Sequence, residues 1–265
     1  MVRSVFPDQN GHPILAAGTF LTTHASPLKE RWGGWYVTGN HEEFLHMGNS
    51  LATEGAGGEA EFDFEAGANL ETLEKRIDLS KYLQPTSDIV ALMVLEHQCR
   101  VHNLLTKAGM EYRRLSYLQK AIDPEADLTD PEGMTRRALV DSAEDILREM
   151  LFCDEFDLGD GVEGSEDFVE AFEGAGSASS SGQSLRKLRL FGRLFKTRCS
   201  YLIHSLAFRS LPDPVREQVL TRLWEILRGT EKDFDHLGSG ERRRIREIVS
   251  ETVENLPACW KAADR

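Results

Sequence analysis

The sequence predicts a mainly α protein: a helical, bundle-like body with a small irregular β-hairpin segment at its N-terminus. From Asn69 onward, long stretches repeat apolar residues at the three- and four-residue spacing of amphipathic helices. Residues 1–52 are instead rich in glycine, threonine and aromatic residues, with turn signals between short apolar runs. The 265 residues suffice to bury a core in one large domain, or in a main domain with an appendage.

Composition divides the chain into five segments. Residues 1–52 form the β-rich segment, with turns expected at PDQNG and TGNHEE. Residues 53–68 are acidic, glycine-rich and poor in large apolar groups, so we expect a mobile insert there. A helical region at 69–152 and a C-terminal helical region at 185–265 are separated by an acidic, Ser/Gly-rich linker at 153–184, also expected to be mobile from about residue 159.

Caps and helix breakers indicate where the helices begin and end. One helix is expected at NLETLEKRI, directly after the insert. Ser87 or Asp88 is a suitable N-cap for the next, and Gly109 is a suitable stop or kink before a second helical piece. Residues 135–152 carry apolar positions on one face, and the LPDP run suits the start of a C-terminal helix.

The charge balance excludes some classes of partner. Lys and Arg total 31 against 44 Asp and Glu, which gives a net charge of -13. A general nucleic-acid surface needs an excess of base, so we expect no nucleic-acid partner. No apolar run approaches the roughly 18 residues that span a bilayer, and MVRSVFPDQNGHP lacks the apolar core of a signal peptide. We expect no membrane span in this chain, whose opening resembles the middle of a β region and suggests a fragment.

The cysteines and the missing catalytic motifs limit the chemistry further. Cys99, Cys153, Cys199 and Cys259 lie forty or more residues apart, so no C-x-x-C pair exists for a zinc ribbon, a redox dithiol or a covalent haem. Three disulfide pairings remain open, beside free buried thiols. The chain also lacks a G-x-S-x-G elbow and a P-loop, so nucleophilic catalysis and nucleotide binding are poorly supported.

The stretch RWGGWYVTGNHEEFLHMGN, residues 31–49, is the first candidate site. With His24 nearby, His41, His46 and Met47 make this the densest group of imidazole and thioether donors in the chain. Haem iron and copper prefer such donors, so Met47 and His46 are candidate metal ligands.

Glycines and tryptophans in the same stretch favour a flat ligand. Gly33 and Gly34 would let the backbone approach it closely, and Trp32 and Trp35 could stack on it. The alternative is that the aromatic residues of WGGWYV anchor a short hairpin to the helical body.

The apolar helix expected at 88–106 is the second candidate site, because polar groups on a buried helix need partners. Glu96 and Asn103 fall about 20° apart around its axis, whereas His97 and His102 diverge by about 140° and cannot easily share one ion. All four are candidate buried polar residues. The alternative is that Glu96 binds an arginine of a neighbouring helix and each histidine binds a backbone carbonyl.

Several strings carry a resemblance to a known family: VRSVFPDQNGHPILAAGTFLTTHASPLKERWGGWYVTG, SDIVALMVLEHQCRVHNLLTKAG, RLFKTRCSYLIHSLAF and LPDPVREQVLTRLWEIL. Together they resemble the region after the haem motif in an uncharacterised family of bacterial exported proteins similar to c-type cytochrome domain proteins. Fuller members carry a Cys-x-x-Cys-His motif upstream, which this chain lacks. The chain also has Asn40 followed by His41 and Glu42 where a Thr-His-Gly run is usual, and it carries acidic inserts of its own.

The resemblance implies haem c as cofactor, with Met47, then His46, then His41 as candidate axial ligands. It also implies a periplasmic or exported location and an upstream haem domain or a redox partner. The leading hypothesis is the C-terminal part of a cytochrome-like protein, serving electron transfer or as a haem-site scaffold. The alternative is a haem-free helical structural or protein-interaction domain. A peroxidase-like haem enzyme using Glu96 or His97 is a third hypothesis, so enzymatic activity stays open.

Overall fold

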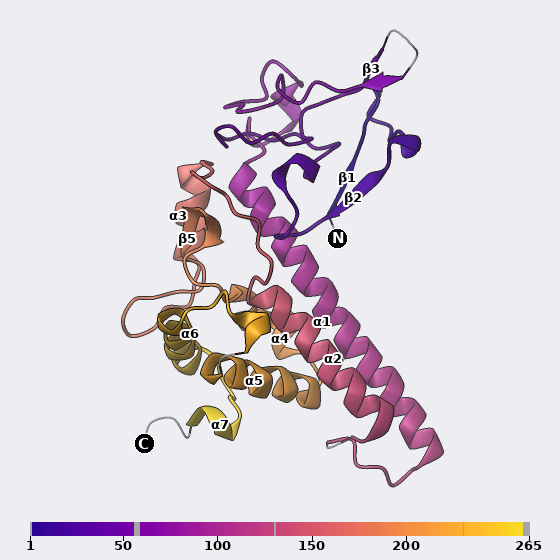
Figure 1. Cartoon of the computed structure of the whole chain (residues 1–265), viewed down its shortest axis with the longest axis vertical. Helices are drawn as coiled ribbons and strands as arrows, with labels where there is room; N and C mark the ends of the chain where they lie inside the picture. Colours follow the sequence, from indigo (N-terminus) through magenta and orange to yellow (C-terminus); the bar gives the residue numbers. More distant parts are fainter. Residues whose placement is uncertain (1, 56–58, 130, 230, 262–265) are drawn as a thin grey trace. The chain divides into compact units, whose positions relative to one another are not determined.

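A computed structural model describes residues 2–55, 59–129, 131–229 and 231–261, and the chain separates into two compact units (Figure 1). Unit 1 comprises Met1–Cys99, Asp154–Gly174 and Leu188–Leu194, and unit 2 comprises Arg100–Cys153, Ala175–Lys187 and Phe195–Arg265. The described residues form seven α-helices and small two-stranded pairings, one of them at the N-terminus. The predicted fold class is therefore confirmed. No helix in this described part has the length and apolar character to cross a bilayer.

Unit 1 begins with a β-hairpin. Strand β1 (Val2–Val5) pairs antiparallel with β2 (Thr19–Thr22), with Val2 opposite Thr22 and Val5 opposite Thr19. Valine and threonine are β-branched and suit this pleated surface. A second, shorter hairpin joins β3 (Thr53–Glu54) and β4 (Ala60–Glu61), so part of the insert expected to be mobile has regular structure; its residues 56–58 lie outside the described residues.

The helix expected at NLETLEKRI does not form. Asn69 has a left-handed φ of 50°, and its side chain bonds the His41 N–H and the Glu42 carbonyl. Arg76 reaches back to the Asn49 carbonyl at 2.9 Å. These tertiary contacts override the helical propensity of the segment. Regular helix within 69–88 is limited, among the described residues, to the short 3-10 helix η3 (Leu79–Lys81).

The longest helix, α1 (Ile89–Ile122), begins in unit 1 and continues into unit 2. Of the two expected N-cap residues, Ser87 and Asp88, it is Asp88 that caps the helix, because its carboxylate accepts the Ala91 N–H at 2.8 Å. Of the stop or kink expected at Gly109, the stop is wrong, because α1 continues through this residue. Gly109 is buried, and a side chain there would contact Leu211 and Pro212 of unit 2, so the glycine serves close packing.

In unit 2, helix α2 (Gly133–Met150) runs antiparallel to the second part of α1. Successive contacts from α1 to α2 establish this direction: Arg100 to Glu149 at 3.5 Å, Lys107 to Asp145 at 3.5 Å, and Gln119 to Thr135 at 2.7 Å. Helix α2 packs against α5 (Asp213–Arg228). Pro214 occupies the first turn of α5, as the LPDP run predicts.

The remaining elements of unit 2 complete its core. They are η4 (Tyr201–His204), α4 (Leu206–Arg209), η5 (Lys232–Phe234), α6 (Ser239–Thr252) and α7 (Ala258–Lys261). The Trp224 and Trp260 rings lie 5.0 Å apart where α7 meets α5. The four cysteines are all free thiols, and burial with the nearby Glu241 carboxylate raises the pKa of Cys199 to about 12.

The segment expected to be a flexible linker is partly structured. Helix α3 (Glu166–Gly174) lies within it, and the hairpin β5 (Leu188–Phe191) and β6 (Arg193–Phe195) follows. In unit 1 the Glu173 carboxylate accepts the Leu188 N–H at 2.8 Å, and the Glu155 carboxylate accepts the Leu194 N–H at 3.0 Å. Acidic side chains therefore bind the backbone of this basic hairpin, which explains why the acidic segment is ordered against it.

Candidate functional site

The aromatic and histidine-rich stretch of unit 1 forms one buried cluster. Trp32, His41, His46 and Met47 are all buried. The His41 and His46 rings lie 4.6 Å apart, and the His46 and Trp32 rings lie 5.5 Å apart, edge to face. The structure thus brings together the donors that the sequence singles out.

The hydrogen bonds of this cluster bear on metal binding. The Asn69 N–H donates to Nε2 of His41 at 3.1 Å, so the neutral ring carries its proton on Nδ1. A metal at Nδ1 would have to displace that proton. Nδ1 of His41 and of His46 has no hydrogen-bond partner among the described residues. Burial, followed by the neighbouring His41, lowers the pKa of His46 to about 3, and burial lowers the pKa of His41 as well.

These residues do not fit a haem as they are placed. An axial ligand must present its donor atom to an open face of the porphyrin, whereas Met47, His46 and His41 are enclosed by protein atoms. Gly33 faces the Val5 carbonyl and the Met47 methyl group, so it allows close packing within the fold.

The other two residues expected around a flat ligand lie at the surface. Gly34 is exposed, with a φ of 83° in the turn. Trp35 is 37% exposed, and its indole N–H binds the Arg3 carbonyl at 3.1 Å. This geometry matches the alternative interpretation, in which the aromatic residues hold a hairpin in place.

The polar residues of α1 have different environments. Glu96 is buried and accepts from Nη1 of Arg31 at 3.0 Å, so its arginine comes from the loop before Trp32 and not from a neighbouring helix. His97 is buried, with its ring 5.9 Å from that of His24. His102 is only partly buried.

Asn103 is exposed, so the expectation that it is a buried polar residue is wrong. Although Asn103 lies close to Glu96 around the helix axis, it is seven residues farther along, where that side of α1 is open to solvent.

Burial shifts the pKa values around the Arg31–Glu96 pair. It raises the pKa of Glu96, against the opposing effect of Arg31, and it lowers the pKa of Arg31, against the opposing effect of Glu96. Burial, with the nearby His24, holds the pKa of His97 well below its usual range. The group lies in the interior of unit 1, which favours a structural role over acid–base chemistry.

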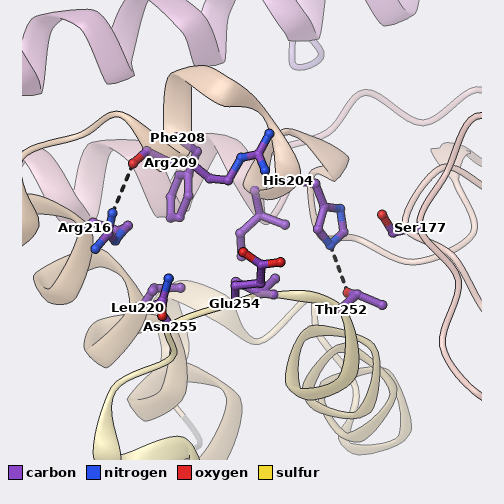
Figure 2. A pocket seen from close by; sticks show the side chains of 11 residues that line it. Ser177, His204, Phe208, Arg209, Arg216, Leu220, Thr252, Glu254 and Asn255 are labelled. Carbon is purple, nitrogen blue, oxygen red and sulfur yellow. Dashed lines mark hydrogen bonds between the residues drawn. The ribbon is translucent and has the colours of Figure 1, made fainter.

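Unit 2 contains a pocket of about 390 Å³ that the sequence did not indicate (Figure 2). Four segments contribute its walls: the loop at Ser177, η4 with α4, the first turns of α5, and the end of α6 with the turn that follows it. Ile203, Phe208 and Leu220 are buried and supply an apolar floor, which Val253 extends. Its size falls in the range of small-molecule pockets, roughly 300–1,000 Å³.

Charged side chains surround this apolar floor. The Arg216 guanidinium is held in place, because it donates to the Arg209 carbonyl at 3.0 Å and to the Asp213 carboxylate at 2.7 Å. The Arg209 guanidinium and the Glu254 carboxylate, by contrast, form no hydrogen bond or ion pair with any described residue, although both line the pocket. Figure 2 shows Arg209 entering the pocket from one edge and Glu254 from the opposite edge.

His204 also contributes a polar group to the wall of the pocket. Its Nε2 lies 2.9 Å from Oγ1 of Thr252, and that hydroxyl donates its own proton to the Ile248 carbonyl at 2.6 Å. Nε2 is therefore the donor, and the ring is fixed (Figure 2). Burial, and the positive charges of Arg186 and Arg209, lower the pKa of His204, so the ring is neutral at pH 7.

Comparison with family models, curated proteins and solved structures finds no match to this chain. The site must therefore be interpreted from its own geometry. Arg209, Glu254 and His204 carry no motif, and they lie up to fifty residues apart in the sequence, so only the packing of unit 2 brings them together. Two sequence features discussed above lie near them: the LPDP helix start and the string RLFKTRCSYLIHSLAF, which contains His204.

Proposed function

We propose that this chain is a haem-free binding protein whose unit 2 pocket holds a small organic anion. The observation that carries the proposal is the Arg209 guanidinium, which is exposed at the rim of a pocket with an apolar floor and has no partner among the described residues. Guanidinium groups bind carboxylates and phosphates through two parallel hydrogen bonds. An arginine at a pocket wall without an acidic partner is available for such a contact.

The surroundings of Arg209 support an anionic ligand with an apolar part. Arg216 also lines the pocket, where its charge is paired with the Asp213 carboxylate and its position is fixed by two hydrogen bonds. The buried Phe208 and Leu220 side chains would exclude water from one side of the ligand, which strengthens electrostatic attraction at the arginine. A free inorganic anion would leave this apolar surface uncovered.

The test is direct binding of organic anions to the whole chain. Calorimetric titration with 4-methylpentanoate, 3-phenylpropanoate and phenyl phosphate should give saturable binding by at least one of them. Arg209→Gln should weaken that binding about tenfold or more, since the charged hydrogen bonds are lost. Arg243→Gln is the matched control, because Arg243 is an exposed arginine of α6 that pairs with Glu247. Absence of saturable binding by the whole panel, or equal effects of the two variants, would contradict the proposal.

A further inference from the structure

We propose that the ligand of the unit 2 pocket is a zwitterion of the apolar α-amino acid type, with its carboxylate at Arg209 and its ammonium group at Glu254. This inference rests on the proposed function and names the class of ligand. It starts from one feature of the pocket: the exposed side chains of Arg209 and Glu254 line the same cavity and form no ion pair with each other.

Opposite charges that share a cavity but form no ion pair leave two sites for a ligand that carries both signs. Each charged group would be desolvated when an apolar ligand fills the space between them, and each then needs a partner of opposite sign. A simple carboxylate would satisfy Arg209 and leave Glu254 beside it uncompensated. A zwitterion satisfies both side chains at once.

The backbone around Glu254 also favours a cation. Glu254 lies just after the last residue of α6, Thr252, where the carbonyl groups of the final turn give the helix end a partial negative charge. The chain leaves the helix at Val253, which is extended, and Asn255 then has a left-handed φ of 56°. A ligand ammonium group placed here meets the carboxylate of Glu254 and the negative end of a fourteen-residue helix together.

The apolar floor indicates the ligand's side chain. Phe208, Leu220 and Ile203 are all buried and line the pocket. An aliphatic or aromatic substituent would cover this surface, whereas a charged or strongly polar one would lose hydration against it. Leucine and phenylalanine are therefore the probes that fit the chemistry of the wall.

The experiment compares matched ligands on the whole chain by calorimetric titration. L-leucine and L-phenylalanine are titrated beside 4-methylpentanoate and 3-phenylpropanoate, which lack the amino group, and beside the amines 3-methylbutylamine and 2-phenylethylamine, which lack the carboxylate. We expect each amino acid to bind about tenfold or more tightly than its two analogues.

Two variants separate this inference from the proposed function. Glu254→Gln should remove the advantage of the amino acid over its carboxylate analogue, while the carboxylate itself binds as tightly as before or more tightly. Arg209→Gln should weaken the binding of the amino acid and of its carboxylate analogue. Glu247→Gln, an exposed α6 variant, is the control, and near-ultraviolet circular dichroism confirms folding of each variant. Equal binding of amino acid and carboxylate would overturn the zwitterion and leave the anion pocket standing. Tightest binding by the amines, or no binding by any ligand, would overturn both.

Discussion

Arg31 donates from Nη1 to Oε2 of Glu96 across 3.0 Å in the interior of unit 1, where the two side chains are 2% and 1% exposed. The guanidinium also donates to the backbone carbonyls of His24 and Ser26. It therefore ties the loop before Trp32 to the first part of α1. Removing two charges from water is costly, and their attraction offsets that cost only while both partners are present.

The Arg31–Glu96 pair gives the first prediction. Glu96→Leu should lower the free energy of unfolding by about 3–5 kcal/mol, because it removes the carboxylate bonded to the buried Arg31 and leaves only the coulombic attraction of Glu155. If packing alone mattered, the loss would be small. We expect a large loss, because the backbone carbonyls that Arg31 also binds cannot neutralise the guanidinium. Urea denaturation followed by tryptophan fluorescence measures it.

The double variant Arg31→Met with Glu96→Leu tests the reason for this loss. It should recover much of the stability, since no lone charge remains buried. Asp145→Asn is the surface control: its pair with Lys107 is more than half exposed on both sides, so the change should cost about 1 kcal/mol or less. A single Glu96→Leu variant as stable as the parent would show that unit 1 hydrates or relaxes around Arg31.

The two tryptophans of the WGGW stretch give the second prediction. Trp32 is 0% exposed and packs against His46, whereas Trp35 is 37% exposed. Trp32→Ala should therefore lower stability by roughly 3–5 kcal/mol by opening a cavity. Trp35→Ala should cost only about 1–2 kcal/mol, from partial contact and one hydrogen bond. The same denaturation assay compares them, and a larger loss at Trp35 would mean that its exposed face is covered in solution.

The helices were predictable where local patterns decide them. Apolar periodicity indicates α2, and the proline of the LPDP run marks the start of α5. Gly109 was misleading because glycine weakens a helix in isolation, whereas here its missing side chain admits Leu211 and Pro212. The expected helix at NLETLEKRI failed because Asn69 is held by backbone groups of residues 41 and 42, far away in the sequence.

The two candidate sites differ in the same way. The histidine and aromatic cluster was visible in the sequence because its members lie within sixteen residues, from Trp32 to Met47. Composition could not show that these side chains face one another instead of a ligand. The pocket in unit 2 is lined by Arg209 and Glu254, ordinary charged residues that lie forty-five positions apart in the sequence. Only the folded chain brings them to one cavity.

The third prediction concerns pH and His46. Burial, with His41 beside it, lowers the pKa of His46 from 6.5 to about 3. Between these values the unfolded chain binds a proton that the folded chain excludes. His46 therefore makes stability fall as the pH drops below about 6.5, by about 1.4 kcal/mol for each pH unit. The loss levels off near pH 3, where the folded ring also becomes protonated.

Urea denaturation at pH 7, 6, 5 and 4 measures this dependence. His46→Gln should be less stable than the parent at pH 7, since the His46 ring packs against Trp32 and His41. Its free energy of unfolding should, however, fall less steeply as the pH is lowered. The difference between the two slopes should correspond to about one proton. His12→Gln provides the surface control, because that side chain is 78% exposed. Parallel pH profiles for the parent and His46→Gln would show that the folded unit admits a proton at His46. The ring would then have to reach water or a counter-charge through motion of the 41–47 loop.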